Sequence, residues 1–199
     1  MMLVEETTVP VLALPVAQFK DHLRLGSGFS DDGVQDAMLE SYLRAAHAAI
    51  EARTGKILIE RAFSWTLTAW RDASRQPLPV APVNAIIAVT LIDVQGQETL
   101  VDPDRWYLEP DTQRPCLQPS GSRLPPLSAG GSVRIGLLAG FGPEWTDLPA
   151  DLAQAVMLLA AHFYDYRHDI SRSAPPMPLG VLALIERYRT VRLFMGGRV

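Results

Sequence analysis

The sequence has a single cysteine, Cys116, among its 199 residues. It can therefore form no internal disulfide and no cysteine-based zinc cluster, and we interpret Cys116 as a small residue of a strand. The chain also lacks any uncharged apolar run of about 18 residues or more, so no membrane span is expected. Residues 1–6 lack the basic and apolar regions of a signal peptide. We therefore expect a cytoplasmic protein without a membrane partner.

Motifs for nucleotide binding and for nucleophilic catalysis are missing as well. The glycines between residues 26 and 33 lack the Gly-Lys-Ser/Thr of a phosphate-binding loop, and Gly55-Lys56 lies where a helix is expected to end. The nucleophile motif G-x-S-x-G does not occur. We therefore predict no enzyme, with no catalytic residue, no cofactor and no metal.

The densest group of chemically active side chains is residues 162–169 (HFYDYRHD). His162 and His168 are six residues apart, whereas zinc-binding histidine pairs on a helix favour a separation of four. We interpret the segment as the end of a helix, with cations near its negative pole and aromatic rings in the core. A metal hydrolase centred on these two histidines remains an alternative.

Charge is unevenly distributed along a chain whose formal net charge is −4. Residues 167–199 hold six arginines and only two acids, Asp169 and Glu186, so the last part of the chain is basic on an acidic body. Such asymmetry is typical of a surface that meets an acidic protein or nucleic acid. Apolar residues make up 48% of the chain, enough for a substantial core.

Apolar residues recur three and four positions apart in four segments, as amphipathic helices require. Ser30, Asp31 and Asp32 offer cap oxygens to the second helix, and Gly55 suits the left-handed position after its end. Asp147 is expected to cap the third helix. The predicted helices are residues 16–24, about 33–54, 148–167 and 180–193.

Between these helices the apolar period changes to two. Apolar residues lie at odd positions from Ile57 to Ala69, and further short strands follow, with a hairpin turn at residues 93–97. We predict five or six antiparallel strands between residues 57 and 139, and an extended arm over residues 1–14.

The order of elements predicts an α+β fold. Its core would resemble a four-helix bundle, with an antiparallel β insertion between the second and third helices. The expected divisions are an arm with the first two helices (1–56), the β insertion (57–142), and the last helices with a tail (143–199).

Several short segments follow a recognisable order along nearly the whole chain, although none is diagnostic alone. They are residues 19–24, 31–32, 45–55, 65–70, 78–83, 139–142, 148–152, 160–167 and 180–189. In this order the sequence resembles the head–tail connector (adaptor) family of phages and phage-like particles, above all the adaptors of alphaproteobacterial gene transfer agents. The β insertion is larger than in the minimal members of that family.

The resemblance implies a structural protein without catalysis. Such adaptors form a ring, typically of twelve copies, beneath the portal, with their helical bundles side by side and the other face towards a stopper or tail protein. DNA passes through the ring without specific binding. The expected location is the cytoplasm during assembly and then the neck of the particle.

A C-terminal segment that reaches into the portal is also implied by the resemblance. Here this segment holds arginines, an apolar trio and two glycines, so it is suited to becoming ordered on a partner. A simple end to the bundle is the alternative. The predicted portal-interface residues are Arg189, Arg192, Leu193, Phe194, Met195, Gly196, Gly197, Arg198 and Val199.

Two other functions remain open at this point. A stopper or tail-completion protein would use the same ring principle lower in the neck. A nucleic-acid-binding module would use the basic tail, and its binding to free DNA would weaken steeply with salt.

Overall fold

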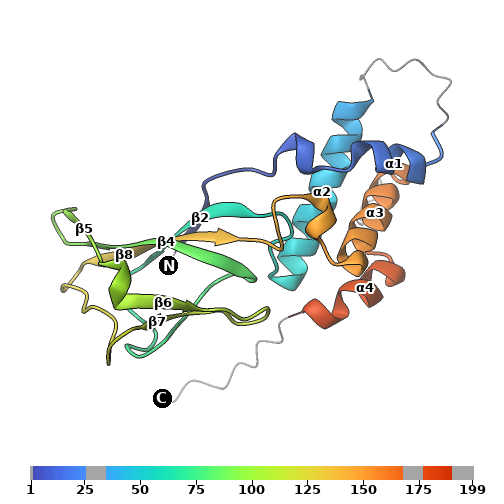
Figure 1. The fold of residues 1–199 in the computed structure, drawn as a ribbon. Helices are drawn as coiled ribbons and strands as arrows, with labels where there is room; N and C mark the ends of the chain where they lie inside the picture. The colour runs from blue at the N-terminus through green and yellow to red at the C-terminus, as the bar shows by residue number, and fades with distance from the viewer. Residues whose placement is uncertain (1, 26–34, 168–176, 190–199) are drawn as a thin grey trace, which may run out of the picture.

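The computed structural model describes residues 2–25, 35–167 and 177–189 (Figure 1). The fold is α+β, with helices and antiparallel sheets, and this part of the sequence prediction is confirmed. The helices gather at one end of the molecule and the strands at the other, here called the helical lobe and the sheet lobe (Figure 1). Each lobe has its own cluster of buried apolar side chains.

The helical lobe is built around α2 and α3, the two long helices, which pack against each other. Apolar residues of all four helices, including Phe19, Leu43, Leu152 and Val181, are fully buried in one cluster. No helix within the described ranges is long and apolar enough to cross a membrane. The helices are α1 (Val16–His22), α2 (Asp36–Thr54), α3 (Ala150–Asp165) and α4 (Leu179–Ile185).

The ends of the helices confirm one sequence prediction and correct two others. Gly55 adopts a left-handed φ of +70° and its N–H binds the carbonyl of Glu51, which ends α2 as predicted. Asp147 does not cap α3, because it closes a 3₁₀ turn in which its carboxylate accepts the N–H of Glu144. The last helix ends at Ile185 rather than near 193 and continues as a 3₁₀ turn. The cap predicted at residues 30–32 lies outside the described residues.

The sheet lobe consists of two antiparallel sheets. The larger has the strand order β1-β2-β8-β4-β5 and the smaller has the order β3-β7-β6. The strands are β1 (Met2–Glu5), β2 (Arg61–Leu67), β3 (Gln76–Pro77), β4 (Val83–Ile92), β5 (Glu98–Leu100), β6 (Trp106–Glu109), β7 (Cys116–Pro119) and β8 (Ser132–Ala139).

Alternation of side chains gives the large sheet one buried face. Phe63 and Trp65 of β2 lie opposite Leu137 and Ile135 of β8, and all four are buried. They share a core with Leu117 of the small sheet. The period of two therefore identified the inner face correctly within β2, but the predicted alternation was too long, because Ala69 lies beyond the end of β2 and is exposed.

The N-terminal arm has more structure than the sequence predicted. Residues 2–5 form β1, which pairs with β2 at the edge of the large sheet. A 3₁₀ turn at Val11–Ala13 follows, and Ala13 and Leu14 are buried in the helical core. The arm therefore contacts both lobes, which a segment without readable periodicity could not reveal.

Candidate assembly site and the junction that supports it

Residues 56–60, which follow Gly55 at the end of α2, form a crossing that carries the chain from one core to the other. Ile57 is buried in the sheet core, whereas Leu58 and Ile59 are buried in the helical core. The backbone of this crossing is held by the segment after β8, because Phe141 N–H binds the Leu58 carbonyl and Glu60 N–H binds that of Gly142. The regular strand β2 thus begins at Arg61 and not at Ile57, since residues 58 and 59 are buried in the helical core and only isolated bridges, at Lys56 and Ile59, precede it.

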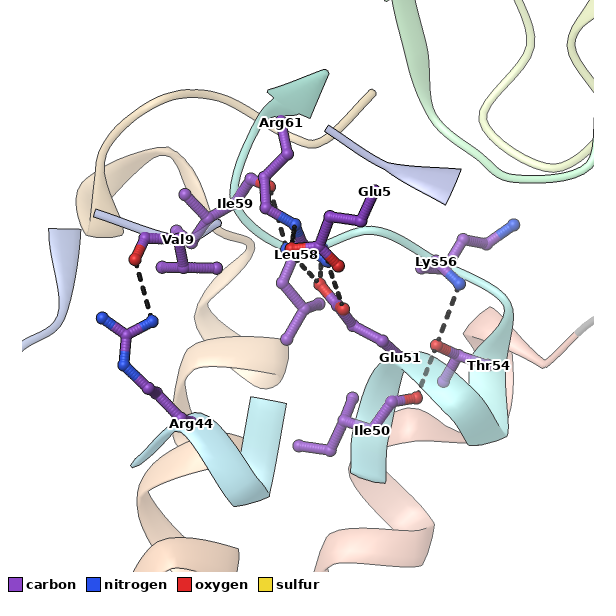
Figure 2. Close-up of polar contacts among 10 residues, drawn as sticks. All are labelled: Glu5, Val9, Arg44, Ile50, Glu51, Thr54, Lys56, Leu58, Ile59 and Arg61. Carbon is purple, nitrogen blue, oxygen red and sulfur yellow. Dashed lines mark hydrogen bonds and ion pairs between the residues drawn. The ribbon is translucent and has the colours of Figure 1, made fainter. Parts of the chain in front are cut away.

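A buried arginine joins three segments at this junction (Figure 2). The Arg61 guanidinium is 5% exposed and makes two parallel contacts with the Glu51 carboxylate of α2, at 3.0 and 2.8 Å. Its Nε lies 2.9 Å from a carboxylate oxygen of Glu5 in β1. Glu51 also accepts the N–H of Leu58 at 2.8 Å. One carboxylate of the helical lobe therefore fixes both the crossing and the first paired residue of β2.

The electrostatics of Arg61 are consistent with a permanently charged pair. Burial is the largest single influence and lowers the pKa of Arg61, but the hydrogen bonds and charges of Glu51 and Glu5 together outweigh it and raise the pKa. Lys56, at the start of the crossing, has no such partner. Its ammonium makes no hydrogen bond among the described residues, and burial lowers its pKa against the opposing charge of Asp111.

A buried histidine lies close to the junction on α2. His47 packs against the ring of Trp145, with 5.9 Å between the ring centroids, and neither of its ring nitrogens has a hydrogen-bond partner among the described residues. Burial, followed by the charges of Arg61 and Arg44, lowers the pKa of His47 from 6.5 to about 4. The imidazole is therefore neutral in the folded protein at pH 7.

We expect this histidine to make the fold acid-sensitive. The unfolded chain binds a proton at His47 near pH 6.5, whereas the folded chain binds it only near pH 4, so stability falls as the pH falls between these values. The loss should amount to roughly 3 kcal/mol. Urea unfolding at pH 7.5 and pH 4 measures it, and His47→Leu should lose less stability over this interval. Equal losses in both proteins would assign the effect to other groups.

The C-terminal end of the described chain is anchored on the first turn of α3. The buried Tyr188 donates its hydroxyl hydrogen to Asp151 at 2.7 Å, and its ring meets Phe141 edge to face. Arg187 lies 2.7 Å from the other oxygen of Asp151. Burial, with the Asp151 hydrogen bond, raises the pKa of Tyr188, which keeps the hydroxyl protonated as a donor. The point where the tail leaves the body is thus fixed.

The structure describes only the first of the predicted portal-interface residues. Arg189 is exposed, has left the 3₁₀ turn, and lies 3.0 Å from Glu186. The anchoring pair Tyr188–Asp151 was missed by sequence reasoning, although both residues lie in segments that carry the family resemblance. The other predicted residues, Arg192, Leu193, Phe194, Met195, Gly196, Gly197, Arg198 and Val199, lie outside the described residues.

The histidine-rich segment at the end of α3 forms part of the helix end. His162 contacts the ring of Tyr166, and the Arg167 guanidinium lies 4.2 Å from the ring centre of Tyr164. His168 and Asp169 lie outside the described residues. Within the described ranges, no group of three or more His, Cys, Asp or Glu side chains is placed to hold a metal ion. Cys116 is buried in β7.

Comparison with known proteins gives a result only among solved structures. No protein-family profile and no curated protein sequence gives a significant match. A chain in the neck of an empty gene transfer agent particle, solved with C6 symmetry, is 56% identical, with a TM-score of 0.89 over 98% of this chain and 99% of that one. The chain belongs to the head–tail adaptor family of gene transfer agents.

Two further matches agree with this assignment. A chain in the virion of a native gene transfer agent particle is 56% identical, with a TM-score of 0.86. A chain in the neck of a native particle, solved with C12 symmetry, is 52% identical, with a TM-score of 0.85, and both cover 98% of the adaptor and 99% of the matched chain. The adaptor is therefore a structural connector, as the order of its sequence segments predicted.

Proposed function

We propose that the adaptor forms a ring of twelve copies between the portal and the tail of a phage-like particle. The observation that supports this most strongly is 56% identity over nearly the full length to a chain in a gene transfer agent neck. In this proposal the adaptor catalyses no reaction. It is assembled in the cytoplasm and becomes part of the neck, where it meets the portal on one side and a stopper or tail protein on the other.

Within the ring we propose that the four helices act as a bundle, packed beside those of the neighbouring copies. The β insertion, with β1 added at the edge of its larger sheet, then forms a separate unit between the second and third helices. DNA passes through the central channel without specific contacts. The divisions 1–56, 57–142 and 143–199 are proposed as the corresponding parts of the chain.

The tail is proposed to bind the portal. Leu193, Phe194 and Met195 act as apolar anchors, and the neighbouring arginines pair with acidic groups of the portal. Support comes from the Tyr188–Asp151 contact, which fixes where the tail leaves the body. A fixed exit lowers the entropic cost of placing each of twelve tails on its own site.

A pull-down against the portal of the same particle tests this proposal. Removal of residues 189–199 should weaken binding by more than about a hundredfold, because three apolar anchors are lost together. A full-length chain with Leu193→Ser, Phe194→Ser and Met195→Ser should show a similar loss of portal binding. A full-length chain with Arg192→Ala and Arg198→Ala should lose less and should retain binding at low salt.

Each outcome of the pull-down has a distinct meaning. Undiminished binding by the truncated chain would show that the portal contact lies elsewhere on the adaptor. Failure of the full-length chain to bind, together with binding to tail components, would favour the stopper or tail-completion function. Tight, salt-sensitive binding to free DNA would favour the nucleic-acid-binding function.

A further inference from the structure

The outer face of the five-stranded sheet is not covered by any described part of the chain. Its inner face packs on the small sheet, but every outer-facing residue of β1, β2, β4, β5 and β8 is at least partly exposed. Exposed apolar side chains on this outer face include Met2, Val4, Ile87 and Leu100. Among the described residues of these five strands, the outward-facing charged side chains are Arg134 and Glu98, which lie 3.0 Å apart as an ion pair. A large face so poor in charge is typical of an interface.

A β-bulge places one of these apolar residues on the outer face. The register between β4 and β8 shifts between Ile86 and Ala88, so Ile87 is an extra residue and leaves the alternation. Its side chain is 60% exposed and lies over Gly136, where a Cβ atom would come within 3.4 Å of the Ile87 Cβ. The bulge thus interrupts the regular pairing of β4 with β8 and leaves Ile87 exposed to solvent.

A second apolar surface lies on the N-terminal arm beside the helical lobe. Leu12, on the 3₁₀ turn after β1, is 100% exposed, and Val11 is also exposed. The turn borders a groove of about 460 Å³, formed by residue 10, residues 12–15 and Gln18 on one side and by residues 143–146 on the other. Of the residues that the structure describes, Glu144 is the one charged residue in the lining of the groove.

We propose that these two surfaces bind each other between neighbouring copies, with the outer sheet face of one adaptor on the Leu12 turn and groove of the next. The proposal rests on the ring proposed above. A closed ring of identical subunits needs two different surfaces on every copy, each complementary to the other. Both surfaces are apolar and poor in charge, because Arg134 and Glu98 leave the face without net charge and Glu144 is the one charge in the described lining of the groove. Arg134 is the group of opposite sign that the face can offer to Glu144.

The two surfaces do not meet within one copy, so a contact between them requires a second copy. Leu12 is fully exposed, although residues 6–10 join its turn directly to β1. The arm between them is held in place, because Glu6 N–H binds the Ala62 carbonyl and Arg44 binds the Val9 carbonyl at 2.8 Å. The Leu12 turn and the outer sheet face are therefore held apart in each copy, and both are available to neighbouring copies.

Two variants and a control test this inference. Ile87→Glu places a charge on the sheet face, and Leu12→Glu places one on the turn. Tyr107→Glu is the matched control, because Tyr107 is about half exposed on the small sheet, away from both surfaces. Each change is at an exposed site and should alter stability by less than about 0.5 kcal/mol. The readout is the number of copies bound to the portal of the same particle, measured by native mass spectrometry.

The wild-type adaptor and Tyr107→Glu should fill the ring, whereas each of the other two variants should bind at least about tenfold more weakly and leave it incomplete. In an equimolar mixture, Ile87→Glu still has an intact turn and Leu12→Glu still has an intact face. One contact per pair is thereby restored, so pairs of unlike copies should form and nothing larger should form without the portal. This pattern is specific to a contact between two different surfaces.

Other results would overturn the inference. Complete rings with both variants would refute it while leaving the adaptor function intact. Complete rings that fail to bind the tail protein would also refute it, because the outer sheet face would then be the binding surface for the tail protein. A defect in only one variant would refute the pairing of the two surfaces. Failure of the wild-type adaptor to bind the portal would instead refute the proposed function and, with it, this inference.

Discussion

Glu51→Ala is expected to lower the free energy of unfolding by about 3–5 kcal/mol. The change removes the two contacts between the Glu51 carboxylate and Arg61, whose side chain is 5% exposed and whose guanidinium cannot lose its proton. It also leaves the N–H of Leu58 without the acceptor it has in the folded chain. Glu5 remains as a partner of Arg61, but it lies on an edge strand and is itself about two-fifths exposed. The buried charge is therefore left largely uncompensated.

Urea unfolding at pH 7 measures this effect, and Glu40→Ala is the matched control. Glu40 also pairs with an arginine from α2, at 2.7 Å, but that pair is partly exposed and should contribute no more than about 1 kcal/mol. A double variant with Glu51→Leu and Arg61→Met should be less destabilised than Glu51→Ala, because no unpaired charge is left buried. A loss for Glu51→Ala as small as that for Glu40→Ala would show that Arg61 finds solvent or another partner.

Gly140→Ala is expected to destabilise the adaptor by roughly 3 kcal/mol, through overpacking and backbone strain together. Gly140 follows β8 and has a φ of +144°, which side-chain-bearing residues rarely adopt. A Cβ atom there would overlap the backbone N and Cα of Glu60 in the crossing between the lobes. A backbone cannot rotate aside as a flexible side chain does, so the two segments would have to separate.

Thermal unfolding compares this variant with Gly121→Ala. Gly121 lies in a loop, has no positive φ, and nothing lies within 4 Å of the Cβ that alanine would add, so its replacement should change stability by less than about 0.5 kcal/mol. If Gly140→Ala proved equally mild, the crossing and the segment after β8 would be able to move apart at little cost. The junction would then be a hinge instead of a rigid joint.

Both predictions concern the same joint, and this matters for assembly. The groove beside Leu12 and the anchor of the tail belong to the helical side, whereas the proposed contact face belongs to the sheet lobe. A loosened joint would change the angle between these surfaces in every copy. We therefore expect Glu51→Ala adaptors that still fold to fill the ring less completely than Glu40→Ala adaptors.

Local patterns in the sequence determined the elements. The three-and-four spacing up to Thr54 and the glycine after it specify α2 and its end, because an amphipathic face and a left-handed terminator act within a few residues. The odd-numbered apolar residues from Phe63 to Leu67 specify the buried face of β2 for the same reason. The order of short segments along the sequence also identified the adaptor family.

Tertiary structure alone decided how the elements are joined. β1 pairs with β2 across about sixty residues of chain, and Arg61 meets both Glu5 and Glu51, although nothing near these residues in the sequence marks them as partners. Leu58 and Ile59 continue the apolar run of a strand but belong to the helical core. Asp147 is a residue type that often caps helices and precedes α3, but its carboxylate closes the 3₁₀ turn before that helix. Periodicity reports which side of an element is buried, whereas the identity of the covering surface depends on contacts between distant segments, which form only when the whole chain packs.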